Sequence, residues 1–175
     1  MLGQRRVLIG LAALTAAAGV AMLPAMSTMS DHGASVIDFE FAGSVERSKE
    51  IVAGWGHVGK AAAWRQLALD VPFLIGYGLL LFAACTALGR RAEAAGRERL
   101  HSMATTVTWF GPAAACADMV QNISLALILA GHETQPWPAL SFLGGAIAFG
   151  LMASGIAFVA IGWVRTRAAA SPVRR

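Results

Sequence analysis

The sequence predicts an all-α integral membrane protein built as a bundle of four transmembrane helices. Of its 175 residues, 57% are hydrophobic and only 14% are charged, whereas soluble proteins carry about 25% charged residues. In lipid, a helix satisfies every backbone amide within its own segment, and about 20 apolar residues cross the hydrocarbon core. We expect a single domain over residues 1–175 that crosses the membrane at residues 7–26, 71–88, 103–130 and 139–164.

The first span follows the basic start MLGQRR, a pattern that secretory signals share. Its apolar stretch of about 20 residues is longer than a usual signal core, and no clear small-x-small cleavage site follows Pro24. We therefore expect a retained helix, with a cleaved signal as the alternative.

Basic residues lie mostly on one side of the predicted spans. Ten of the fourteen lysines and arginines fall in the N-terminus, in the loop after the second span, or in the C-terminus. The positive-inside rule then places both termini in the cytoplasm of a bacterial cell, with the protein in the inner membrane. The pI near 9.8 follows from this topology, and no basic patch interleaved with aromatic residues indicates a nucleic-acid partner. The expected partner is the lipid bilayer.

Residues 44–69 form the organised part of the outer loop. Ser44 is a candidate N-cap, and apolar residues recur after it at near-helical spacing. The pattern predicts an extracytoplasmic amphipathic helix that caps the bundle, with Trp55 and Trp64 at headgroup level. Three glycines weaken this prediction, and a loosely folded connector is the alternative.

The second and third spans each contain a proline. In Asp70-Val-Pro72, Asp70 is a candidate N-cap and Pro72 suits the first turn of a helix. Pro112 lies inside the third span, where it removes one backbone hydrogen bond and is expected to kink the helix.

Two stripes of small residues predict close helix packing or, equally, a homo-oligomer face. The first comprises Ala13, Ala17, Ala21 and Ala25, and the second Ala146, Gly150 and Ser154.

No Cys-x-x-Cys motif is present, so we expect Cys85 and Cys116 to be buried, inert thiols. His57, His132 and Glu133 are a weak candidate for a metal site because the histidines lack metal-ligand spacing. We expect neither a metal nor a cofactor.

Polar residues of the third span form the candidate site. Asp118 lies roughly 18 Å below the outer end of its helix, near mid-membrane, where ionisable side chains are usually partnered or functional. Asn122 shares its face and Gln121 borders it. Tyr77 of the antiparallel second span lies at nearly the depth of Asn122, so these side chains are expected to meet and to open toward Asp70.

The motifs DVPFLIGY from Asp70 and DMVQN from Asp118 resemble a loose group of small four-helix bacterial membrane proteins of unassigned function. Members of this group carry Asp-x-x-Phe-x-x-x-Tyr in the second helix and Asp-x-x-Glu-Asn in the third. The resemblance spans about residues 39–130. It departs at Gln121, which replaces Glu and removes one of two carboxylates. The resemblance implies the topology and the importance of these positions, and it implies no reaction.

The leading hypothesis is a membrane protein that binds an apolar or amphipathic small molecule, of lipid or isoprenoid type, in an outward-opening pocket within the bundle. The predicted contacts are Tyr77, Asp118, Gln121 and Asn122, with Asp70 and Trp55 at the outer surface. One alternative is a membrane enzyme that uses Asp118 as acid or base and Tyr77 as hydrogen-bond donor. Another is a structural or accessory subunit in which the cluster only joins helices. A proton-coupled transporter would require oligomerisation.

Overall fold

The computed structural model describes residues 2–132 and 134–168, which form six helices and no strand. Four helical stretches in this part of the chain are long and apolar enough to cross a membrane. The chain therefore has the architecture of a multi-pass helical membrane protein, as predicted. The helices are α1 (Leu2–Asp31), α2 (Val36–Glu40), α3 (Val45–Ala94), α4 (Glu98–Val107), α5 (Phe110–Leu129) and α6 (Trp137–Ala168).

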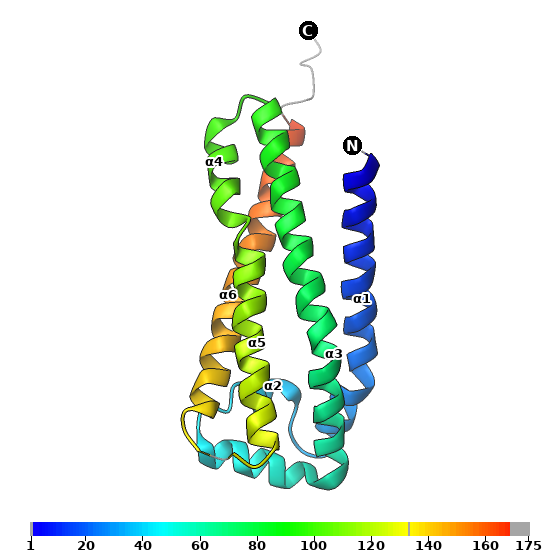
Figure 1. The fold of residues 1–175 in the computed structure, drawn as a ribbon, viewed down its shortest axis with the longest axis vertical. Coiled ribbons are helices and arrows are strands. Elements are labelled where there is room, and N and C mark those ends of the chain that lie inside the picture. The colour runs from blue at the N-terminus through cyan, green and yellow to red at the C-terminus, as the bar shows by residue number, and fades with distance from the viewer. Residues whose placement is uncertain (1, 133, 169–175) are drawn as a thin grey trace.

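Gly56 divides α3 into two parts that run in different directions. Its φ of 55° lies in the left-handed region that favours glycine. Figure 1 shows the first part of α3 lying across one end of the bundle and the second part running along its length. The segment 44–69 is therefore helical, but only its beginning lies across the end. The remainder continues without interruption through Asp70, so the predicted N-cap role of Asp70 is wrong.

The third predicted span is two helices instead of one kinked helix. α4 ends at Val107 and α5 begins at Phe110, which places Pro112 in the first turn of α5. Proline offers no amide to the carbonyl four residues before it, and its ring would clash with that carbonyl. The break therefore lies ahead of Pro112, at Thr108 and Trp109.

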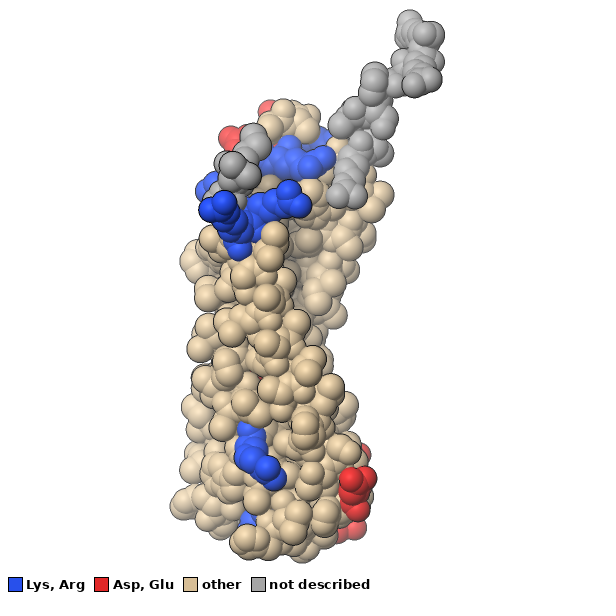
Figure 2. Space-filling view, turned by 90° about the vertical axis from the view of Figure 1, so that its right-hand side faces the viewer, with Lys and Arg blue, Asp and Glu red and all other residues tan. Residues whose placement is uncertain are grey.

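Charged residues gather at the two ends of the molecule. Figure 1 shows that α1 begins and α6 ends at the same end of the bundle, where Lys and Arg form the larger of the clusters visible in Figure 2. The face between the two ends is almost free of charge in that view. We call the first end the basic end; the arginines there whose side chains the structure describes are Arg5, Arg6, Arg90, Arg91, Arg97, Arg99 and Arg165.

The close helix contacts lie at glycines outside the two predicted stripes of small residues. A Cβ atom on Gly111 would overlap the backbone oxygen of Gly78, so α3 and α5 cross here at backbone contact. A Cβ atom on Gly144 would lie 2.8 Å from the backbone oxygen of Ala117, which fixes the approach of α6 to α5. In contrast, Gly150 has no atom within 4 Å of such a Cβ.

The two predicted stripes face outward, away from the rest of the described bundle. Six of their seven residues are exposed and only Ala25 is buried. Their predicted role in packing the bundle is therefore wrong, because the periodicity of small residues does not say which face of a helix meets a neighbour.

Candidate functional site

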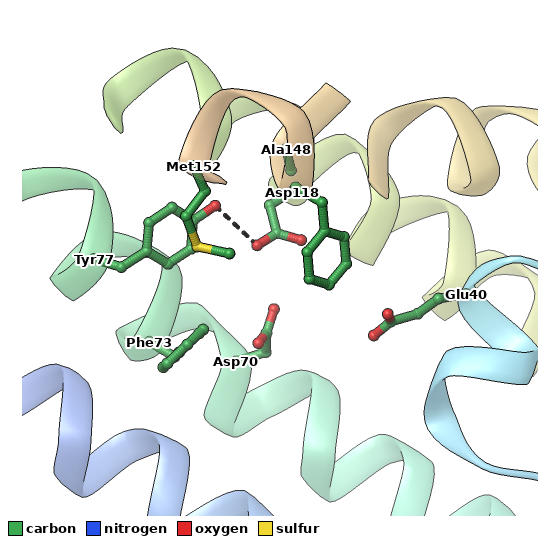
Figure 3. Close-up of a pocket in the computed structure, with 8 residues that line it drawn as sticks. Glu40, Asp70, Phe73, Tyr77, Asp118, Ala148 and Met152 are labelled. Carbon is green, nitrogen blue, oxygen red and sulfur yellow. Dashed lines mark hydrogen bonds between the residues drawn. The ribbon is translucent and has the colours of Figure 1, made fainter. Parts of the chain in front are cut away.

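A small pocket lies where α2, α3, α5 and α6 approach one another. Its volume is about 70 Å³, and three carboxylates, those of Glu40, Asp70 and Asp118, point toward the same space in Figure 3. Aromatic and aliphatic side chains complete the lining, and we call this cavity the carboxylate pocket. The remaining lining residues are Phe73, Tyr77, Ala148, Phe149 and Met152.

Two hydrogen bonds join α3 to α5 at the carboxylate pocket. The Tyr77 hydroxyl donates to Oδ2 of Asp118 over 3.0 Å, and Nδ2 of Asn122 donates to Oδ2 of Asp70 over 2.6 Å. The ring of Phe73 packs against that of Tyr77, with centroids 5.5 Å apart. The two polar sets therefore meet as expected, but each carboxylate has its own donor.

Glu40 enters the pocket because α2 is held on two sides. Ser35 and Asp38 form a reciprocal capping box that starts this short helix. At its other end, the Ser141 hydroxyl of α6 donates to the backbone oxygen of Glu40 over 2.9 Å. The Phe39 ring is buried against α3. These contacts direct the Glu40 side chain inward from α2 (Figure 3).

Sequence reasoning missed Glu40 as a site residue. It is one of several acidic residues in the loop between the first two spans, and no motif separates it from its neighbours. The capping box was a readable signal for the helix. That signal gives no information about the distant residue Ser141, which holds the helix against α6.

Other predicted contacts lie outside the carboxylate pocket. Trp55 is 1% exposed, and its Nε1 donates to the backbone oxygen of Ala34 over 2.8 Å. It is therefore a core residue and does not contact the carboxylate pocket as predicted. Gln121 is also buried, against α6, and its amide nitrogen has no hydrogen-bond partner in the described part of the chain. His57 and His132 are exposed and do not line the pocket.

The two cysteines differ in their surroundings. Cys85 is buried, but Cys116 is exposed on the face of α5 that borders an apolar groove with α3. The prediction that both thiols are buried is therefore wrong for Cys116. Within residues 2–132 and 134–168, no three His, Cys, Asp or Glu side chains are placed to hold a metal ion. Glu133 of the candidate metal site lies outside the described residues.

An apolar groove continues from the carboxylate pocket along α3 and α6. Its volume is about 290 Å³, and it shares Tyr77 and Met152 with the pocket. The other lining residues are all aliphatic: Leu80, Leu81, Ala84, Ile156, Val159 and Ala160. We call it the α3–α6 groove. The polar carboxylate pocket and the apolar α3–α6 groove are therefore neighbouring cavities that share part of their walls.

The carboxylate pocket carries no neutralising cation from the described residues. The ion pair between described side chains joins Arg47 to Glu50, and none of the three pocket carboxylates takes part in one. Burial and the nearby carboxylates of Asp70 and Asp118 raise the pKa of Glu40 to about 8. Glu40 therefore keeps its proton at neutral pH in the folded protein.

This pKa predicts a pH dependence of stability. Between pH 4.5 and about 8, folded Glu40 binds a proton that the unfolded chain releases, so stability is lost as pH rises through this range. We expect the melting temperature of Glu40→Gln, compared with wild type, to rise as pH increases across this interval. Thermal unfolding in detergent measures this difference. Glu93→Gln, an exposed substitution outside the pocket, serves as control, and a Glu40→Gln curve parallel to wild type would contradict the prediction.

No family model, curated protein or solved structure matches this chain.

Proposed function

We propose that the protein binds an amphipathic small molecule, of lipid or isoprenoid type, from within the membrane. The polar end of the molecule occupies the carboxylate pocket and its apolar body occupies the α3–α6 groove. In the proposed topology both termini are cytoplasmic in a bacterial inner membrane, because the basic end carries most of the arginines. The carboxylate pocket then lies in the outer half of the bundle, where Glu40 belongs to the loop that follows the first span.

The observation that carries this proposal is the junction of the two cavities at Tyr77 and Met152. The carboxylate pocket, at about 70 Å³, holds a small polar group and is far below the roughly 300 to 1,000 Å³ of ordinary ligand pockets. The α3–α6 groove adds about 290 Å³ of apolar space. Together they match a molecule with a compact polar head and an aliphatic chain.

The hydrogen-bonding groups of the pocket select the chemistry of the head. Asp70 and Asp118 each use one oxygen to accept from a protein donor, and the Glu40 carboxyl has no hydrogen-bond partner among the described residues. The unused oxygens of the Asp70 and Asp118 carboxyls are acceptors, the protonated Glu40 carboxyl can accept as well as donate, and a carboxylate that is ionised also attracts a cation. The head is therefore an alcohol, an amine or an ammonium group, and a carboxylate or phosphate head is disfavoured.

The test compares the lipids and small molecules bound to wild type and to Asp118→Asn, using native mass spectrometry of the purified proteins. Dodecylamine and dodecanoate serve as added probes of the same chain length. We expect wild type to bind dodecylamine in preference to dodecanoate. Asp118→Asn should lower amine affinity about tenfold or more, since hydrogen bonds to charged groups are among the stronger ones. Glu93→Gln makes the same charge change away from the pocket and should bind as wild type does.

Three results are informative. If Asp118→Asn binds as wild type does and only its melting temperature changes, binding in this pocket is refuted and the cluster only joins helices. Equal binding of amine and carboxylate by wild type would refute the proposed head chemistry. Conversion of a bound molecule by wild type, but not by Asp118→Asn, would assign Asp118 to the alternative role of acid or base.

A further inference from the structure

We propose a second binding site, for a phosphate group, in the cavity between α3 and α4 at the basic end. Its volume is about 310 Å³, and polar side chains line it, among them Thr86, Arg90, His101, Thr105 and Thr108. We call it the α3–α4 cavity. It shares no lining residue with the carboxylate pocket, so this proposal is independent of the proposed function.

Thr108 supplies a hydroxyl that has no partner in the described part of the chain. The residue is only 9% exposed, and its hydroxyl makes no hydrogen bond with a described residue. The helical residues Thr15 and Thr86 instead donate to the carbonyl four residues before them. Thr108 follows the end of α4, where the helix breaks ahead of Pro112. Because Thr108 lines the cavity, its hydroxyl is available to a ligand acceptor there.

Arg90 supplies the positive charge. It lines the α3–α4 cavity, is exposed, and forms no ion pair with a described residue. Its guanidinium has five donors in a planar array that matches phosphate oxygens. No acidic side chain lines the cavity. The local electrostatics therefore favour an anion.

His101 completes the cavity wall from α4. Its Nδ1 lies 3.1 Å from the backbone oxygen of Gly89, and a carbonyl only accepts, so Nδ1 carries the hydrogen. Nε2 is then the ring nitrogen left for a ligand. Thr86 and Thr105 use their hydroxyl hydrogens on the carbonyls of Phe82 and Ser102. The donors toward an anion are accordingly Arg90, Thr108 and, when protonated, His101.

The place of the cavity makes an anionic lipid the expected source of the phosphate. Basic pockets between transmembrane helices at the level of the headgroups bind such lipids. Trp109, which follows Thr108 in the chain, is 64% exposed and packs against Phe82 with ring centroids 5.7 Å apart. Exposed tryptophans at helix ends are typical of the membrane interface. A lipid there could place its phosphate beside Arg90 and its chains along the apolar face below.

The test uses the full chain in detergent with equal amounts of dioleoylphosphatidylglycerol and dioleoylphosphatidylcholine, and native mass spectrometry to measure which lipid is retained. We expect wild type to retain phosphatidylglycerol selectively, and Arg90→Gln to lower its affinity about tenfold or more. Thr108→Val keeps the side-chain shape and should lower retention by a smaller factor. Arg99→Gln makes the same change in charge at an exposed arginine outside the cavity lining and should retain the lipid.

Inorganic phosphate distinguishes the two sources. If added phosphate displaces phosphatidylglycerol from wild type, the site accepts free phosphate as well; if it does not, the site requires the lipid. Equal retention of both lipids by wild type would overturn the proposal. The same holds if Arg99→Gln loses as much phosphatidylglycerol as Arg90→Gln, because general charge attraction would then explain the binding. Circular dichroism confirms that each variant is folded.

Discussion

Replacing Trp55 by alanine is expected to lower the free energy of unfolding by about 3 to 5 kcal/mol, the range for large aromatic side chains removed from a core. Trp55 is 1% exposed, its ring packs edge to face on Phe39 with centroids 4.9 Å apart, and its Nε1 donates to the Ala34 carbonyl. Alanine removes both the ring contact and the hydrogen bond, and it leaves a cavity beneath α2.

The loss should extend to the carboxylate pocket. Phe39 belongs to the same short helix as Glu40, so loosening the packing at Phe39 should free the Glu40 side chain from the carboxylate pocket. Thermal or denaturant unfolding measures the stability, and dodecylamine binding measures the pocket. Trp64→Ala is the control, because Trp64 is 44% exposed and its removal leaves no cavity in the described core. A Trp55→Ala protein as stable as Trp64→Ala would contradict the core position of Trp55.

Replacing Asn122 by leucine is expected to lower the free energy of unfolding by about 2 to 3 kcal/mol. Asp70 and Asn122 are 8% and 7% exposed, and Nδ2 of Asn122 lies 2.6 Å from Oδ2 of Asp70. Leucine has the same branched side-chain skeleton as asparagine and offers no donor, so the Asp70 carboxyl loses its partner inside the bundle. An unpartnered buried polar group costs more than the net value of the hydrogen bond itself.

A double-mutant cycle isolates the pair. Asp70→Leu removes the carboxyl as well, so the double variant Asp70→Leu, Asn122→Leu leaves neither group unpaired. We expect the double variant to be more stable than the sum of the two single losses predicts, with a coupling energy of about 1 to 3 kcal/mol. Additive losses would show that the hydrogen bond contributes nothing. Ile123→Leu, on an exposed face of the same helix, controls for the added leucine.

Part of the candidate site was predictable because it depends on one helix at a time. Asp118 and Asn122 share a face through the helical repeat, and rise per residue places Tyr77 at a similar depth. These two rules suffice to predict that Tyr77 and the polar residues of α5 meet. They assign the wrong role to Asp70, because proline favours the first turn of a helix but is also tolerated inside transmembrane helices, as Pro72 is inside α3. Only the continuous course of α3 places Asp70 opposite Asn122.

Composition and charge by themselves determined that the chain is an all-helical protein with four apolar helices. Backbone amides in lipid must be paired within their own segment, which requires helices, and crossing the hydrocarbon core requires each helix to be long and apolar. The tertiary structure decided which of the small and polar residues face inward. Gly111 and Gly144 lie at helix crossings and Gly150 does not, although all three are glycines inside predicted membrane spans. Glu40 reaches the carboxylate pocket through a hydrogen bond from Ser141, a residue 101 positions away. Such contacts follow from how the helices pack against one another, which local periodicity does not encode.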